Sequence, residues 1–172
     1  MPSLDDLKKR IKSVKNTQKI TKAMKMVAAA KLKKAQEKAE NGRPYSDRMQ
    51  DIILNLTKSI SDKSNAPKLL FGNGKDEVYL GVVITADRGL CGGFNTNICK
   101  LAKKSFKDLL NNGKKIKILT VGSKGHDQLK REFENYIIEN ISFKDKKNIT
   151  FKEANQIGNL ILKLFNEEKF DK

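Results

Sequence analysis

The N-terminal third of the chain constrains the fold most, because its pattern fits one long helix. No Gly or Pro occurs between Ser3 and Gly42. Ser3 and Asp6 have the S-x-x-D spacing of a capping box, which marks a helix start. Apolar residues then recur with the alternating spacing of a narrow coiled-coil seam, at Leu4, Leu7, Ile11 and Val14. The pattern predicts a helix to Ile60, with a kink or break at Pro44, whose ring removes a backbone hydrogen bond.

The predicted seam has no partner within the sequence. It passes through Gln18 and Thr21 and resumes at Ile20, Met24 and Val27. No second segment of the 172 residues shows a comparable long seam. A helix with such a seam gains most of its stability from packing against another helix. We therefore expect the partner helix to come from another chain, or from sequence outside these residues.

The charge of the chain requires an acidic partner. Lys and Arg number 36 against 20 Asp and Glu, which gives a net charge of +16. Residues 7–36 contain no acidic residue, and a helix face of one sign repels itself unless an acidic surface lies along it. The cations of this window are Lys8, Lys9, Arg10, Lys12, Lys15, Lys19, Lys22, Lys25, Lys31, Lys33 and Lys34. A basic helical nucleic-acid-binding protein is the alternative, but the window has no aromatic residue for base stacking and a single Arg.

Composition excludes several other classes of protein. No apolar run approaches the roughly 18 residues of a membrane span, and the N-terminus lacks the pattern of a secretory leader. Two cysteines and one histidine cannot supply a four-ligand zinc site. We therefore expect no metal, no cofactor, no membrane-spanning segment and a reducing compartment.

The rest of the chain has the pattern of an α/β fold with a parallel sheet. Residues 61–77 are rich in Ser, Asn, Lys and Gly and are expected to form a linker loop. Short apolar runs then alternate with amphipathic segments, which is the order of strands and crossover helices. The predicted strands are 78–85, 117–121 and 136–141; the predicted helices are 97–110, a segment ending at 133, and one opening at a Thr150–Glu153 capping box. The segment at 170–172 lies where a further strand is expected to start.

Three short motifs are candidates for chemistry, and a structural interpretation is favoured for each. Gly89, Gly92 and Gly93 follow the first strand, but their spacing matches neither the dinucleotide fingerprint nor the P-loop, so a structural turn is favoured. The segment Gly122-Ser123-Lys124-Gly125 is a weak phosphate-cradle signal. Cys91 precedes a helix, a position that can lower the pKa of a thiol. As the nucleophile of an acyl transfer it would need a base, for which His126 is the candidate. A small buried thiol is the favoured interpretation of Cys91.

Several segments together resemble one protein family. They are NTQKITKAMKMVAAAKL at 16–32, Arg43-Pro44-Tyr45, TADRGLCGGFN at 85–95 and the Gly122–Gly125 segment. The matches occur in order and cover both halves of the chain. They resemble the γ subunit of rotary F-type ATP synthases, in its N-terminal part.

The resemblance implies a fold and a role. In that family the N-terminal helix pairs with a long C-terminal helix as a central shaft, with a Rossmann-like domain between the two. The implied function is that of a central-stalk rotor subunit, coupling proton flow through a membrane ring to ATP synthesis. Catalysis occurs on the β subunits of that complex, so the resemblance implies a subunit with no catalytic residues and no cofactor. The family continues past the end of this sequence, so its last strands and C-terminal helix are not included.

The resemblance also implies partners and contact residues. Lys22, Met24 and Lys25 match the part of the shaft that faces the acidic lever loops of β. Arg43 and Tyr45 match the foot of the shaft near the c-subunit ring. The implied partners are the α and β subunits, the ε subunit and the c ring, with no nucleic acid. The implied location is peripheral, on the cytoplasmic face of the bacterial inner membrane, and the mitochondrial matrix side is the alternative.

Overall fold

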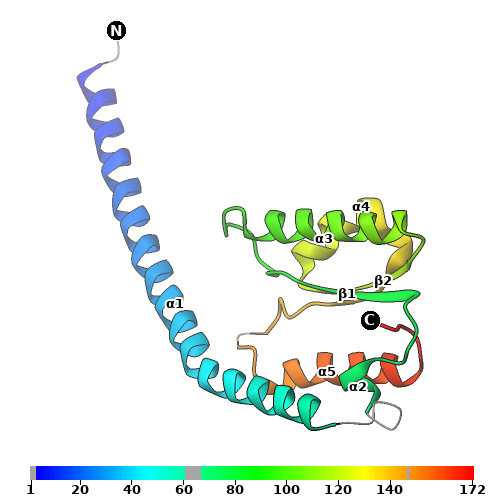
Figure 1. Ribbon diagram of the computed structural model, residues 1–172. Helices are drawn as coiled ribbons and strands as arrows, with labels where there is room; N and C mark the ends of the chain where they lie inside the picture. The colour runs from blue at the N-terminus through cyan, green and yellow to red at the C-terminus, as the bar shows by residue number, and fades with distance from the viewer. Residues whose placement is uncertain (1–2, 61–66, 147) are drawn as a thin grey trace. The chain divides into compact units, whose positions relative to one another are not determined.

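The structure is a computed structural model that describes residues 3–60, 67–146 and 148–172. The chain divides into two compact units, Met1–Asp62 and Lys63–Lys172. The first unit contains one 56-residue helix, α1 (Leu4–Ser59), drawn in blue to cyan in Figure 1. The predicted capping box opens it, because the Asp6 amide donates to the Ser3 hydroxyl and the Ser3 amide donates to the Asp6 carboxylate. The long N-terminal helix is therefore confirmed.

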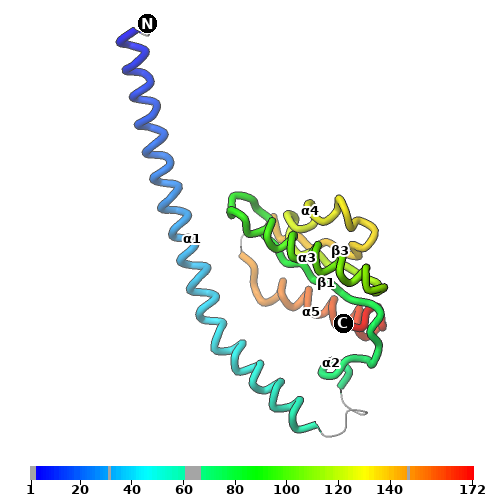
Figure 2. Tube along the Cα trace, turned by 45° about the horizontal axis from the view of Figure 1, so that its top comes forward, coloured from blue at the N-terminus to red at the C-terminus, as the bar shows by residue number. Residues whose placement is uncertain are grey.

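Pro44 does not interrupt α1. The helix is continuous across Gly42-Arg43-Pro44, so the possibility of a break there is wrong. Figures 1 and 2 show α1 bending in its light-blue to cyan part, the part of the helix that contains Pro44. A proline inside a helix removes one backbone hydrogen bond but leaves those on either side to continue the helix.

The second unit is built around a three-stranded parallel sheet of order β1-β2-β3. Its elements are α2 (Lys68–Phe71), β1 (Val78–Ile84), α3 (Phe94–Asn111), β2 (Lys115–Val121), α4 (Ser123–Phe133), the 3-10 turn η1 (Glu134–Tyr136), β3 (Ile137–Ile141) and α5 (Phe151–Asn166). Helices α3 and α4 lie over one face of the sheet, and α2 and α5 lie on the other (Figure 1). The predicted α/β class with a parallel sheet is confirmed.

The core lies between the sheet and the α3–α4 layer. It contains seven buried side chains in one cluster: Val83, Cys99, Phe106, Ile116, Ile118, Leu129 and Phe133. Ile116 and Ile118 alternate along β2, as expected for a strand that presents every second residue to one face. The rings of Phe106 and Phe133 meet edge to face with centroids 5.6 Å apart, which adds to the apolar burial.

The other face of the sheet is joined to the last residues of the chain. Helix α5 opens at the predicted capping box, where the Thr150 amide and hydroxyl both donate to the Glu153 carboxylate. Phe165 of α5 packs against Phe170, with ring centroids 5.6 Å apart. The Asp171 amide donates to the Val78 carbonyl at 2.8 Å, and the Leu80 amide donates to the Lys172 carbonyl at 2.7 Å. Residues 171 and 172 therefore hydrogen-bond along β1, and they lie in the segment where a further strand was predicted to start.

Three details of the sequence prediction are corrected. The segment expected to be a loop contains the one-turn helix α2, while residues 61–66 of that segment lie outside the described residues. The third strand begins at Ile137, because η1 takes up Tyr136. The helix predicted over 97–110 extends over Phe94–Asn111, and its Leu101 is 67% exposed. Helix α3 instead turns Asn95, Cys99 and Phe106 toward the sheet.

Candidate subunit-interface surfaces

The apolar seam of α1 is open to solvent. Its first four apolar residues, Leu4, Leu7, Ile11 and Val14, are between 44% and 69% exposed. Exposing four large apolar side chains in one line is unfavourable, since burying each one is worth about 1.5–3 kcal/mol. Among the described residues, α1 is the only helix or strand of its unit, so no other element of that unit covers the seam. An exposed apolar line along a helix has the geometry that packing against another helix requires.

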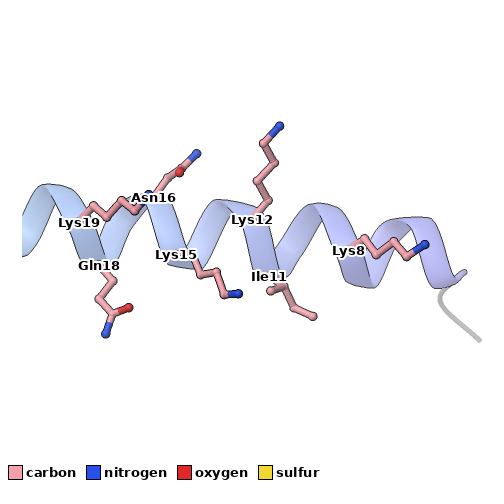
Figure 3. A pocket seen from close by; sticks show the side chains of 7 residues that line it. All are labelled: Lys8, Ile11, Lys12, Lys15, Asn16, Gln18 and Lys19. Atoms are coloured by element: carbon pink, nitrogen blue, oxygen red, sulfur yellow. The ribbon is translucent and has the colours of Figure 1, made fainter.

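A row of lysines runs beside the seam. Lys8, Lys12, Lys15 and Lys19 repeat at spacings of four, three and four residues, so they follow the helix axis as the seam does. Figure 3 shows them with Ile11 and Gln18, two seam positions that point to one side of the ribbon. Among the described side chains, α1 has one ion pair, Lys33 with Glu37 at 3.9 Å. The charge of this row is therefore not neutralised along the helix itself.

Lys22, Met24 and Lys25 are all exposed on α1, but they do not share one face. Successive residues of an α-helix are about 100° apart around its axis. Lys22 and Lys25 are three residues apart and point to the same side. Met24 is two residues from Lys22 and points away from it. One partner surface can therefore contact the two lysines together, while Met24 faces a different direction.

Arg43 and Tyr45 lie on either side of Pro44 and are also exposed. The Tyr45 side chain is 72% exposed, which is unusual for a residue that combines a large apolar ring with a polar tip. Because the two positions are two residues apart in a helix, their side chains point to different sides of α1. They can therefore make separate contacts on two sides of the helix.

The structure explains two of the three glycines in the turn after β1, Gly92 and Gly93, but not Gly89. Gly92 has φ of +58°, a conformation that glycine adopts without strain, and Gly93 is the N-cap of α3. Asn95, which is buried, accepts a hydrogen bond from the Ala86 amide at 3.0 Å and donates to the Cys91 sulfur at 3.2 Å. Nothing in the structure requires a glycine at position 89, where a Cβ would meet open space.

The two cysteines are in different environments, and the expectation for Cys91 is wrong. Cys91 is exposed, whereas Cys99 is the small buried thiol of the core. Burial raises the pKa of the Cys99 thiol, which opposes formation of the reactive thiolate. No three His, Cys, Asp or Glu side chains gather into a metal-binding group among the described residues.

The Gly122–Gly125 segment is the N-terminal turn of α4 rather than a free phosphate cradle. Gly122 is the N-cap, and the Ser123 amide donates to the Asp87 carboxylate at 2.8 Å. Asp87 belongs to the motif at 85–95, but the sequence pattern predicted no role for it. The available signal was an acidic residue in the loop just after the first strand, at the edge where parallel strands end.

None of the helices in the described part of the chain combines the length and apolar character that crossing a membrane requires.

Comparisons with known proteins agree on one family. The model of the family described as ATP synthase matches residues 3–172. An ATP synthase gamma chain of Pelagibacter ubique is 63% identical over 171 residues, and that of Rhizobium etli is 54% identical over 171 residues. Each match covers 99% of this chain, which in turn spans 59% and 58% of the two relatives.

Solved structures give the same result. The central stalk and c ring of the Tetrahymena thermophila mitochondrial ATP synthase include a chain that is 35% identical, with a TM-score of 0.61. That match covers 83% of this chain and 58% of the other. A rotor chain of the Euglena gracilis mitochondrial enzyme shares the fold at a TM-score of 0.52 and 23% identity, over 95% of this chain and 52% of the other. Because the family model spans residues 3–172, the chain belongs to the ATP synthase family.

Proposed function

We propose that the chain serves as a central-stalk rotor subunit of a proton-driven ATP synthase. The open seam of α1 is the observation that carries this proposal, because a shaft helix needs an apolar line for its partner helix. The family membership and the likeness to a chain of a central stalk support it. In this role the chain couples proton flow through a membrane ring to ATP synthesis on the β subunits, and carries out no reaction of its own.

Lys22, Met24 and Lys25 are proposed to contact the β lever loops at successive rotor positions. All three side chains are exposed; Lys22 and Lys25 point to one side of α1, and Met24 points to another. A lysine against a carboxylate at such a surface is worth about 0.2–1 kcal/mol and is weakened by salt. Contacts this weak suit a surface that must exchange one partner for the next.

The remaining surfaces are assigned to the foot of the stalk. Arg43 and Tyr45 are proposed to contact the c ring, and the α/β unit to lie near ε. The proposed organisation is a shaft helix over residues 1–60, a linker over 61–77 and a Rossmann-like domain from 78 to 172. The complex would be peripheral to the bacterial inner membrane on its cytoplasmic face.

Association with the catalytic head tests the proposal. The tagged chain is produced together with the α, β and ε subunits of the same organism and purified through its tag at about 0.1 M salt. We expect α and β to be retained, and the chain alone to show no ATP hydrolysis. Purification of the chain without α and β, under conditions where α and β assemble with each other, would contradict the proposal.

A seam variant and a matched control sharpen this test. Leu7→Ser with Ile11→Ser removes two apolar side chains from the seam, whereas Asn16→Ser changes a residue beside the lysine row. We expect the seam variant to lower the yield of retained α and β several-fold and the control to leave it unchanged. Equal retention by all three chains would show that the seam is not needed for assembly.

A further inference from the structure

Helix α4 lacks a cap of its own. The first four N–H groups of an α-helix have no partner within the helix, and a side chain at the N-cap normally accepts from one of them. The N-cap of α4 is Gly122, which has no side chain to do so. The N–H groups of Ser123, Lys124 and Gly125 must therefore find acceptors elsewhere.

Three consecutive residues after β1 supply those acceptors. The Ser123 amide donates to the Asp87 carboxylate at 2.8 Å, and the Lys124 amide to the Ala86 carbonyl at 3.3 Å. The Gly125 amide donates to the Thr85 hydroxyl oxygen at 2.8 Å. The segment Thr85-Ala86-Asp87 thus caps the first turn of a helix that begins 36 residues later in the sequence.

The glycines of α4 allow this close approach. A Cβ on Gly122 would lie 2.3 Å from the Thr85 carbonyl oxygen, and φ of Gly122 is +101°. A Cβ on Gly125 would lie 2.7 Å from the Thr85 hydroxyl oxygen. Real Cβ atoms do not come this close to backbone or side-chain atoms, so both positions require glycine as long as Thr85 stays in place. The two glycines of the segment therefore have a structural purpose.

Asp87 also reaches the loop that follows β3. Its carboxylate accepts from the Ser142 hydroxyl at 2.7 Å and from the Phe143 amide at 2.9 Å, while its own carbonyl accepts from the Ser123 hydroxyl at 3.0 Å. Burial raises the pKa of Asp87, but the hydrogen bonds from Ser142, Ser123 and Phe143 outweigh it, so the pKa lies below its usual range. The carboxylate is held in its charged form, which is the better acceptor.

We propose that Asp87 is an internal anion that holds the three loops at the carboxyl ends of β1, β2 and β3 in one fixed arrangement. In open α/β sheets this edge is where a ligand binds, with its negative group at a helix N-terminus. Here the chain's own carboxylate takes that place. Asp87 is a positioning residue: it anchors the start of the turn that carries the fully exposed Leu90.

Amide hydrogen exchange of the whole chain, followed by NMR, tests the proposal. Asp87→Asn keeps the shape of the side chain but removes the charge that the two amides face. We expect the Ser123 and Phe143 amides to exchange at least about tenfold faster, through local opening, with Leu119 of β2 unchanged. Asp127→Asn, on the exposed side of α4, is the matched control and is expected to change neither amide.

Two outcomes would overturn the proposal. One is exchange of Ser123 and Phe143 within twofold of the native chain. The other is an equal rise at Leu119, which would mean that Asp87 contributes only to global stability. If Asp87→Asn does not fold, Ser142→Ala removes one of the donors and keeps the carboxylate. It is expected to raise exchange at Phe143 by a smaller factor, and no change there would equally count against the proposal.

A pH titration reports on the Asp87 carboxylate separately from the overall stability of the chain. In the native chain the Ser123 and Phe143 amide resonances should shift together, with one midpoint, as the Asp87 carboxylate gains its proton. In Asp87→Asn this shared transition should disappear. Its persistence in the variant would assign it to another group and would contradict the proposal.

Discussion

The ring of Phe106 in α3 occupies the space that a side chain on Gly81 of β1 would need. A Cβ at Gly81 would lie 2.3 Å from Cε1 of Phe106, which is itself buried in the core. Helix and strand can approach this closely because residue 81 has no side chain. Phe106 therefore packs directly over the backbone of β1 at this point.

Gly81→Ala is therefore expected to destabilise the chain. An added methyl group in a packed core costs about 1–3 kcal/mol, because side chains or backbone must shift to admit it. Urea unfolding of the chain, followed by circular dichroism, measures the loss. The matched control is Gly158→Ala in α5, where a Cβ meets nothing within 4 Å.

The control variant should change stability in the opposite direction. Replacing a glycine inside a helix by alanine stabilises it by about 0.5–1 kcal/mol. Equal effects of the two substitutions would mean that the Gly81–Phe106 contact does not constrain the core. A double variant, Gly81→Ala with Phe106→Leu, should cost less than the sum of its single changes if the two residues compete for one space.

The capping box of α5 predicts a dependence of stability on pH. Hydrogen bonds from the Thr150 side chain and amide lower the pKa of Glu153 to about 2, from an ordinary value of 4.5. A carboxyl whose pKa is lowered by folding adds stability above its unfolded pKa, and this stability is lost as the pH falls through the folded pKa. The contribution of Glu153 should therefore be present at pH 5 and decline between about pH 4.5 and pH 2.

Glu153→Gln tests this dependence, because glutamine keeps the capping geometry but does not titrate. Urea unfolding at several pH values should show that the variant loses less stability than the native chain between about pH 5 and pH 2. Glu139→Gln, an exposed carboxylate on β3, serves as the control. An identical pH profile for the native chain and Glu153→Gln would contradict the expected role of the box.

The open seam predicts that α1 is weakly protected in the isolated chain. Most of the stability of a helix in a protein comes from packing of its apolar face, and that face is exposed here. Amides of α1 should exchange orders of magnitude faster than those of β1 in a monomeric sample. Protection of α1 equal to that of Val78–Ile84, in a chain shown to be monomeric, would rule out the coiled-coil interpretation.

Charge reversal on α1 tests the proposed contact with β. Lys22→Glu with Lys25→Glu places two acidic side chains on one side of α1, against acidic loops. We expect weaker retention of α and β, by about 0.5–2 kcal/mol in total at low salt, with the difference shrinking at high salt. Lys58→Glu, near the C-terminal end of α1, is the control. Retention unaffected by the double reversal at low salt would remove these two lysines from the interface.

Local patterns in the sequence predicted much of the fold. The capping boxes at Ser3 and at Thr150 marked the true starts of α1 and α5, because both partners of such a box lie within one turn. The apolar run from Val78 predicted β1, since a strand covered on both faces leaves little choice of residue. These signals are local, so they can be recognised without knowledge of the tertiary structure.

The orientation of α3 could not be predicted in full. Apolar residues occur around more than half of this helix, and a partner surface decides which of them are buried. Leu101 is exposed, while Cys99, two residues earlier and on the opposite side, is buried. The polar side chain of Asn95 is also turned inward, where its oxygen accepts a hydrogen bond from the Ala86 amide. Only the tertiary contacts show which side chains of α3 are buried.

The cap of α4 was beyond prediction for the same reason. Gly122 and Gly125 suggested a phosphate cradle, because glycine permits close approach of any group. The group that approaches is Thr85, from a distant part of the sequence. The exposed positions of α1 that are candidates for partner contact, such as Lys22 and Met24, were identified through the family resemblance, and their roles stay predictions.

The subunit composition of the native enzyme tests whether this chain is a rotor subunit. The ATP-hydrolysing complex would be solubilised from membranes of the organism that makes this chain, purified, and analysed by mass spectrometry of its peptides. We expect peptides from both α1 and the α/β unit, at one chain for every three α and three β subunits. A complex that hydrolyses ATP and retains α and β, but yields no peptide of this chain, would contradict it.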